Sequence, residues 1–137
     1  MSAQGYDIRL LAPAGIEDHH AHLLRLDYLD RCLFFSAGGD DRAVDSHCLR
    51  LLSAQAIVIG AYEGAKLRAS VEIVPDRTGR CGRATLIAEK DAQSDNLADA
   101  LFARAKDEAR KHGLSQLDVV GMTGTPQKIR TQMARFA

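Results

Sequence analysis

A short polar run at the start of the longest predicted helix has the residue types of an anion site. Ser94, Asp95 and Asn96 stand where an apolar stripe begins, and that stripe predicts a helix over Asp95 to Lys111. Backbone N–H groups at a helix start carry partial positive charge and bind anions such as phosphate. The same residue types are also preferred N-caps, which only begin a helix. The run therefore fits two interpretations, an anion-binding loop and a simple helix start.

Histidine is the second residue type that suggests chemistry. His19 and His22 are three positions apart on a predicted helix, which is a spacing compatible with metal ligands. No cysteine or carboxylate set completes such a site, so we predict surface or packing histidines and no metal. The three cysteines, Cys32, Cys48 and Cys81, are far apart and form no CxxC pair, which is typical of reduced thiols.

Length and charge narrow the class of protein. The 137 residues fit one domain over residues 1–137, and 46% of them are apolar, enough for a buried core. Eighteen basic side chains balance eighteen acidic ones, which argues against a nucleic-acid binder because such proteins neutralise phosphates. The apolar runs are too short for a transmembrane helix, and Met1 to Asp7 lacks the pattern of a secretory signal. Together with the reduced thiols, this predicts a cytoplasmic protein with no membrane partner.

The hydrophobic pattern predicts the element order β, α, α, β, β, β, α, β, α. The expected strands are Tyr6 to Leu11, Ala56 to Tyr62, Lys66 to Val74, Arg83 to Glu89 and Leu114 to Val120. The expected helices are Gly15 to Leu26, with a continuation or second helix to Phe35, one from Asp40 or Asp41 to about Leu52, Asp95 to Lys111, and a short last one from Pro126. In the first helix, Ile16, His20, Leu23 and Leu24 share the expected apolar face. Three consecutive strands and one crossover helix indicate a mixed, mostly antiparallel α/β (α+β) sheet with one parallel step.

Three stretches in this order of elements are similar to one enzyme family. The segment Arg31-Cys-Leu-Phe-Phe-Ser-Ala-Gly-Gly-Asp40 looks like an R-x-R-F-F-type link between two helices. The hairpin Gly64-Ala-Lys-Leu-Arg-Ala-Ser-Val-Glu72 is similar to a G-x-L-V-G-x-A-E pattern, with Ala69 where glycine is usual. The stretch Thr85-Leu-Ile-Ala-Glu89, followed by Gln93-Ser-Asp-Asn-Leu-Ala98, matches a Q/R-x-x-G-x-G/A motif between a strand and a helix. On these residues the chain resembles the GNAT superfamily of N-acyltransferases, with a mixed central sheet and helices on both faces.

The resemblance implies acetyl-CoA or another acyl-CoA as co-substrate. The backbone of Ile87 and Ala88 would then pair with pantetheine, and the loop amides would hold the pyrophosphate. The implied loop residues are Gln93, Ser94, Asp95, Asn96, Leu97 and Ala98. Asn96 replaces a glycine of the motif, and it tolerates positive φ at a cost of about 1 kcal/mol. The Asp95 carboxylate about 4 Å from a phosphate would cost about 1 kcal/mol in water-like surroundings and about 4 kcal/mol at an intermediate dielectric.

The resemblance also implies a base that takes a proton from the acceptor amine, and Glu72 and Glu89 on the central strands are the candidates. The family's usual tyrosine acid is absent from the last helix, and its usual last two strands are missing because the sequence stops at Ala137. An unpaired edge along Leu114 to Val120 would favour a homodimer.

Two functions therefore stay open. One is an N-acyltransferase that moves an acetyl or other acyl group from acyl-CoA to an amine. The other is a catalytically inactive GNAT-like interaction or regulatory module. The strand–loop–helix frame and Gln93 favour the enzyme, whereas Asp95, Asn96, the absent tyrosine and the early end of the sequence favour the inactive module.

Overall fold

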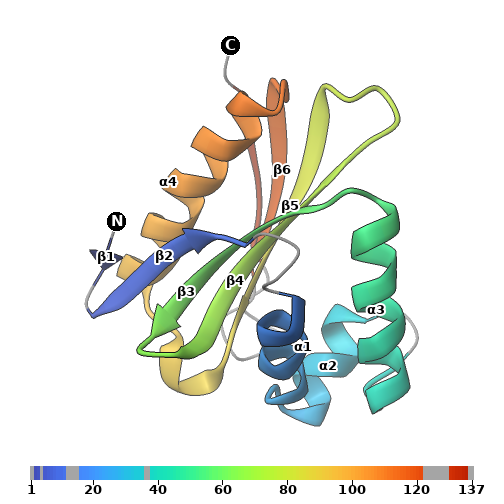
Figure 1. Ribbon diagram of the computed structural model, residues 1–137. Helices are drawn as coiled ribbons and strands as arrows, with labels where there is room; N and C mark the ends of the chain where they lie inside the picture. The colour runs from blue at the N-terminus through green and yellow to red at the C-terminus, as the bar shows by residue number, and fades with distance from the viewer. Residues whose placement is uncertain (1, 4, 12–15, 36–37, 122–129, 136–137) are drawn as a thin grey trace.

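A single twisted sheet organises the molecule (Figure 1). The computed structural model describes residues 2–3, 5–11, 16–35, 38–121 and 130–135. Seven strands lie in the order of the sequence: β1 (Ser2–Ala3), β2 (Tyr6–Leu10), β3 (Ile57–Glu63), β4 (Lys66–Pro75), β5 (Cys81–Ala88), β6 (Gln116–Gly121) and β7 (Arg130–Arg135). Neighbouring strands are antiparallel except for β5 and β6, which are parallel. The predicted fold class, a mixed and mostly antiparallel sheet, is confirmed.

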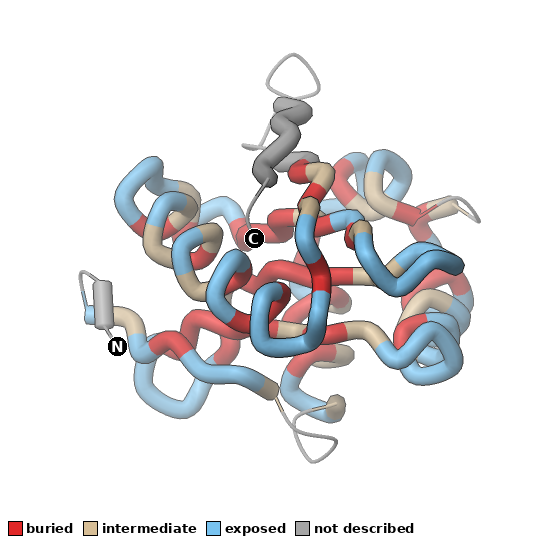
Figure 2. Tube along the Cα trace, turned by 90° about the horizontal axis from the view of Figure 1, so that it is seen from above, coloured by how far each residue is buried: buried red, intermediate tan, exposed pale blue. Residues whose placement is uncertain are grey.

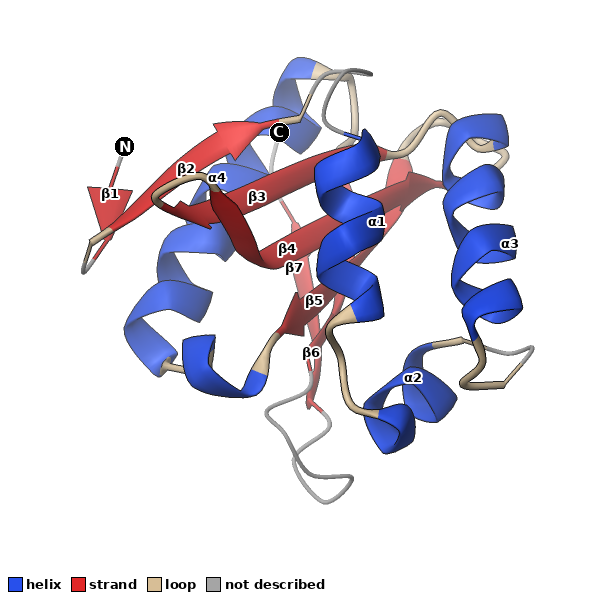
Figure 3. Ribbon diagram, turned by 60° about the horizontal axis from the view of Figure 1, so that its bottom comes forward, coloured by secondary structure: helices blue, strands red, loops and turns tan. Residues whose placement is uncertain are grey.

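Helices cover both faces of this sheet (Figure 3). One face carries α1 (Ile16–Leu24), α2 (Tyr28–Phe34) and α3 (Asp41–Ser53). The other face carries α4 (Asp95–Lys111), which forms the crossover between β5 and β6, preceded by the short 3-10 helix η2 (Lys90–Ala92). The predicted parallel step through the longest helix is therefore present, and the bounds predicted for that helix match those observed.

The core has two layers, and buried residues run through the middle of the molecule (Figure 2). The larger layer lies between the sheet and α4 and contains, among others, Ile59, Val71, Ile73, Leu101 and Leu117. The smaller layer lies between the other face of the sheet and the three helices, and it contains Leu23, Leu26, Phe35, Ala43, Val44 and Ile87. Both faces of β4 and β5 are therefore covered, so polar side chains on either face are removed from water.

Local chemistry explains where the longer helices begin and end. The Asp40 carboxylate accepts a hydrogen bond from Ala43 N at 2.8 Å and caps α3, which settles the choice between Asp40 and Asp41. Ser94 caps α4 in the same way, with Oγ accepting from Leu97 N at 3.1 Å. Gly113 follows α4 with φ +84°, which a residue without Cβ adopts at no steric cost.

The C-terminal segment differs from the prediction. A helix from Pro126 was expected, and residues 122–129 and 136–137 lie outside the described part of the chain. Arg130–Arg135 is a strand, however, and it pairs with β6 from Gln116↔Arg135 to Gly121↔Arg130. Pairing with a neighbouring strand overrides the local helical spacing because it satisfies the backbone groups of β6. The edge of β6 is thus covered by β7. The homodimer was predicted because that edge was expected to be unpaired, so the structure does not support the argument for it.

The buried face of α1 also differs from the prediction. His19, His22 and Leu23 are buried, whereas His20 and Leu24 are only half-buried. His19 and His22 in this face contact the carboxylates of Glu72 and Glu89. These contacts allow two polar residues to occupy buried positions where the pattern predicts hydrophobic ones.

Candidate functional site

The first feature of the site is a split between two parallel strands. Among the described residues, the last pair of β5 with β6 is Leu86↔Gly121, while β5 continues to Ala88. Glu89 N donates to Arg68 O at 3.1 Å, so the backbone groups of Glu89 face β4. Because successive residues of a strand alternate, the N–H and C=O of Ala88 face the opposite side, toward the split. The backbone of Ala88 is therefore in place for an added extended ligand.

Ile87 does not share this position. It is paired with Ser70 of β4 and, by the same alternation, turns its backbone groups toward that strand. Its side chain is buried among the residues of the smaller core layer. Of the two residues predicted to pair with pantetheine, only Ala88 offers its backbone to the split, and the prediction for Ile87 is corrected accordingly.

The start of α4 closes one end of the split. Leu97 is buried in the core, and Asp95 and Asn96 are exposed in the first helical turn. Asn96 has no positive φ, because Gln55 is the one described non-glycine residue in that region. The positive φ considered for Asn96 is therefore not adopted, and its conformational cost does not arise.

A small hollow lies beside this helix start, on the α4 face of the sheet. Its lining includes most of the residues predicted to bind the cofactor. The lining residues are Ala69, Leu86, Ala88, Ala92, Gln93, Ser94, Leu97, Ala98 and Leu101. Short side chains on the strands and the helix keep it open. Gln93 Nε2 donates to Ala88 O at 3.2 Å, so the carbonyl that faces the split already has an amide partner.

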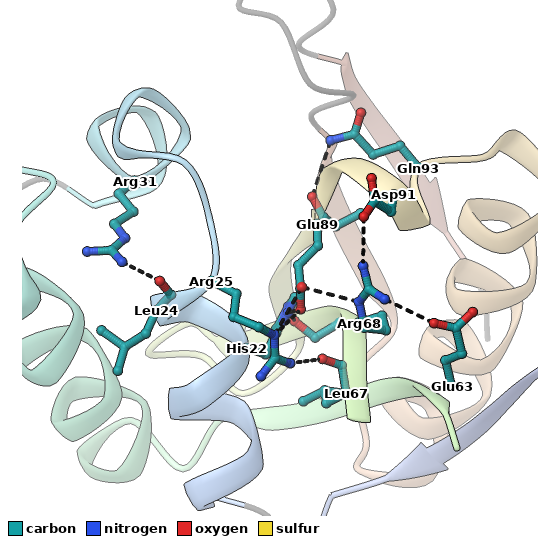
Figure 4. Close-up of polar contacts among 12 residues, drawn as sticks. His22, Leu24, Arg25, Arg31, Glu63, Leu67, Arg68, Glu89, Asp91 and Gln93 are labelled. Carbon is teal, nitrogen blue, oxygen red and sulfur yellow. Dashed lines mark hydrogen bonds and ion pairs between the residues drawn. The ribbon is translucent and has the colours of Figure 1, made fainter. Parts of the chain in front are cut away.

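Glu89, the first candidate base, is surrounded by hydrogen-bond donors from His22, Arg25 and Arg68 (Figure 4). Its carboxylate accepts from His22 Nδ1 at 2.8 Å, from Arg25 Nε at 3.0 Å and from Arg68 Nε at 3.2 Å. Burial alone would raise the pKa of Glu89, but the hydrogen bonds from His22 and Arg25 outweigh it and lower the pKa. A carboxylate held in this way is a weak proton acceptor. Its geometry suits an anchor between α1 and the end of β5.

Arg68 extends this cluster toward solvent. Its guanidinium also contacts Glu63 Oε1 at 2.9 Å and Asp91 Oδ2 at 3.5 Å, so it links β3, β4 and the segment before α4 (Figure 4). On the other side, His22 Nε2 lies 3.2 Å from Ser70 Oγ. Burial lowers the pKa of His22 more than its contact with Glu89 raises it.

Glu72, the second candidate base, lies on β4 and faces α1 and α3. Its two oxygens contact two histidines, Oε2 with His19 Nε2 and Oε1 with His47 Nε2, both at 2.7 Å. Burial would raise the pKa of Glu72, but the hydrogen bonds from the two histidines prevail and lower it to about 2. Glu72 therefore stays ionised at neutral pH and acts on the imidazoles that it holds.

The sequence predicts His19 and His22 as surface or packing residues and does not single out His47. One signal for their role was available. His19 and His22 are one helical turn apart, and their partners are also neighbours, since Glu72 lies on β4 and Glu89 directly follows β5. Cys48 on α3 is half-buried, and burial raises the pKa of its thiol to about 11.

Two further findings concern the described residues. No helix among them is long and apolar enough to cross a membrane. In the same part of the chain, no group of three or more His, Cys, Asp or Glu side chains is arranged to hold a metal ion.

Comparison with known proteins places this architecture. No protein-family model matches the chain, and no curated protein matches it. Among solved structures, it is similar to a ribosomal-protein-alanine N-acetyltransferase from Brucella melitensis biovar Abortus 2308, with TM-score 0.60, 23% identity, 89% of this chain and 83% of that one. The GNAT domain of S. lividans PAT matches with TM-score 0.66, 13% identity, and 84% and 71% of the two chains. The GNAT-family N-acetyltransferase YhbS from Escherichia coli, solved with CoA, matches with TM-score 0.63, 19% identity, and 88% and 65%.

These likenesses define the class of architecture: the chain has the fold of the GNAT acetyltransferases. The resemblance noted in the hairpin and in the strand–loop–helix segment is thus matched by the whole arrangement of strands and helices.

Proposed function

We propose that the chain is an acyl-CoA-dependent N-acyltransferase, which moves an acetyl or other acyl group to an amine. One observation carries the proposal: β5 extends to Ala88, beyond its last described pair with β6 at Leu86↔Gly121, and Ala88 turns its backbone away from β4 to that side. The N-terminus of α4 stands next to that split and suits a phosphate group. The YhbS structure, solved with CoA, and an aminoglycoside 6′-N-acetyltransferase complexed with coenzyme A, at TM-score 0.62 and 14% identity, support the same class of ligand.

Each part of the site would then have a separate task. Ala88 would bind the extended pantetheine arm through its backbone, while the amides of the first turn of α4 would hold the pyrophosphate. Ala69, Ala88 and Ala98 would leave room for the arm on the α4 face. The predicted cytoplasmic location fits an acyl-CoA co-substrate and stays a prediction.

A specific observation favours the alternative, a catalytically inactive interaction module. Asp95 places a carboxylate in the first turn of α4, where the pyrophosphate would lie. A negative charge there stabilises the helix start and opposes an anionic ligand. Gln93 further occupies the Ala88 carbonyl with its own amide.

Calorimetry with acetyl-CoA and CoA separates the two functions. An acyltransferase should bind acetyl-CoA with a Kd below roughly 100 μM. Asp95→Arg should tighten binding by roughly tenfold, because it replaces repulsion with attraction at the pyrophosphate. Asp99→Arg is the matched control, since Asp99 is exposed on the same helix one turn further from its start. Undetectable binding at millimolar ligand would contradict the proposal and leave the interaction module.

A further inference from the structure

Three side chains from three elements meet on the sheet face opposite α4. His19 comes from α1, His47 from α3, and Glu72 from β4 between them. The side chains of His19 and Glu72 are 5% and 4% exposed, whereas that of His47 is 17% exposed. His47 is therefore the member of this cluster with access to a ligand from solvent.

The two histidines differ at their second ring nitrogen. His19 Nδ1 is buried and has no hydrogen-bond partner among the residues that the structure describes. His47 Nδ1 is not sealed in this way, and the described residues offer it no hydrogen bond. The Phe35 ring lies 4.7 Å from the His47 ring, between centroids, and limits its movement. His47 is thus held in place by the contact of Nε2 with Glu72 and by the Phe35 ring, and Nδ1 remains available to accept a hydrogen bond or a proton.

His47 also lines a wide hollow between the C-terminal half of α3 and the end of β4. The other lining residues are Arg50, Leu51, Ser53, Ala54 and Val74. Half of this lining is aliphatic, and Arg50 adds a positive charge. A neighbouring cation disfavours the charged form of an ammonium group, which lowers its pKa and eases the loss of its proton.

The cluster lies nearer the split than the rest of the hollow does. Glu72 is paired with Thr85 of β5, and Thr85 directly precedes Leu86, which forms the last described pair of β5 with β6. Val74, in the wall of the hollow, is paired with Arg83 and so lies further from the split. An acceptor that occupies the hollow would therefore bring its amine to the split at the His47 end, on the face opposite α4.

A carboxylate that accepts a hydrogen bond from one imidazole N–H leaves the other ring nitrogen as a proton acceptor, and its charge stabilises the imidazolium that forms. Glu72 is in that position toward His47, with Oε1 at 2.7 Å from Nε2. Because its own pKa is lowered to about 2, Glu72 remains the anion of the pair rather than the base.

On these observations we propose that His47, positioned by Glu72, is the proton acceptor for the amine substrate, which enters the hollow between α3 and β4. This inference rests on the proposed acyltransferase function. One proton of the ammonium passes to His47 Nδ1 and on to solvent. The amine nitrogen then forms a bond to the thioester carbonyl carbon, the carbon–sulfur bond breaks, and the sulfur leaves with the electron pair. The second amine proton is transferred to the sulfur, so the products are an amide and free CoA thiol.

The test compares His47→Gln with His20→Gln. The glutamine amide can still donate to Glu72 but cannot act as a base at neutral pH. His20 is a matched control because it also contacts a carboxylate, Asp45, with Nε2 and Oδ1 2.6 Å apart, but lies outside the cluster. CoA thiol release would be followed with acetyl-CoA and a panel of amines comprising spermidine, lysine amide, an alanine-terminated peptide and an aminoglycoside. We expect His47→Gln to lower kcat by about 10²–10⁴-fold while the Kd of acetyl-CoA stays unchanged, and His20→Gln to change neither.

Chemical rescue separates proton transfer from a merely structural role. In His47→Ala, millimolar imidazole should restore part of the lost kcat, and Glu72→Gln should lower kcat without such rescue. The pH–rate profile of the parent should show one basic group that His47→Gln removes. The charged and titratable groups around His47 are Glu72 from β4, His19 from α1, which contacts the same carboxylate, and Arg50 on its own helix.

The possible results separate this inference from the proposed function. Full turnover by His47→Gln, or loss of turnover without imidazole rescue in a folded His47→Ala, would overturn the role of His47. Binding of acetyl-CoA without thiol release from any of the amines would also overturn it, while leaving the cofactor site. Absence of acetyl-CoA binding would overturn the proposed function itself. Urea unfolding of each variant shows whether a loss of turnover is caused by misfolding. If His47→Ala does not fold, the turnover of His47→Gln, which keeps the donor to Glu72, decides the role of His47.

Discussion

His22 Nδ1 lies 2.8 Å from Glu89 Oε2, and this contact ties the last turn of α1 to the residue that follows β5. The segment toward α4 begins at that residue. Glu89 also accepts from Arg25 and Arg68, so one carboxylate fixes a helix, a strand and a loop start together. We therefore assign Glu89 a positioning role, although it was predicted as a candidate base.

Replacement of Glu89 tests this role through stability. Glu89→Gln should lower the free energy of unfolding by about 2–3 kcal/mol, because it leaves the partly buried guanidinium groups of Arg25 and Arg68 without their carboxylate. Urea unfolding followed by circular dichroism measures it. Glu63→Gln is the matched control: Glu63 also contacts Arg68, but its side chain is 56% exposed, and we expect a loss below about 1 kcal/mol. Equal losses in the two variants would contradict the anchoring role.

His22 should make the folded state sensitive to mild acid. Burial lowers its pKa below the ordinary 6.5, so the unfolded chain binds a proton at higher pH than the folded one. The corresponding stability is present above pH 6.5 and is lost as the pH falls below it. Unfolding free energies measured between pH 7.5 and 5.5 should fall less steeply in His22→Gln than in the parent. His20→Gln, at a partly exposed position, should keep the parent slope, and a His22→Gln slope equal to the parent's would show that this group is not the cause.

The amphipathic part of the fold could be predicted from the sequence, and the polar core could not. The stripe and cap of α4 are local signals, and its predicted bounds agree with Asp95–Lys111. On β4, the alternating pattern separates apolar residues from Ser70 and Glu72. It therefore predicts that the face of the strand carrying these two polar residues is exposed to solvent. In the structure, the helices on that face bury both residues, at 0% and 3% exposed. Burial on that face depends on tertiary packing, which periodicity does not contain.

The same limit explains the error at the C-terminus. Helical spacing near Ile129 and Met133 is a local pattern, whereas β7 forms because its backbone pairs with β6. For the site, the sequence pattern brought out Gln93, Ser94 and Ala98, which share one motif. It could not bring out His47, since its partner Glu72 is 25 positions away and meets it only in the folded sheet.

The contact made by Ser94 supports one of the two interpretations of the polar run, the helix start, and a stability measurement tests it. Its Oγ accepts from Leu97 N, so Ser94→Ala should cost about 1 kcal/mol of unfolding free energy through the lost cap. Ser46→Ala, at an exposed position inside α3, is the control and should change stability by less than about 0.5 kcal/mol. Urea unfolding midpoints compare the two. An unchanged midpoint in Ser94→Ala would mean that the cap contributes nothing to α4.

Gln93 should act as an internal competitor at the split. Its Nε2 donates to Ala88 O, the carbonyl that an extended pantetheine amide would use. Gln93→Ala frees this acceptor, so binding of acetyl-CoA should tighten by about 3–10-fold, the value of one hydrogen bond of about 0.5–1.5 kcal/mol. Calorimetry with pantetheine alone should show the same gain, because the effect does not involve the phosphates. Gln55→Ala at an exposed site controls for loss of a glutamine, and weaker binding of both ligands by Gln93→Ala would mean that Gln93 holds the ligand rather than blocking it.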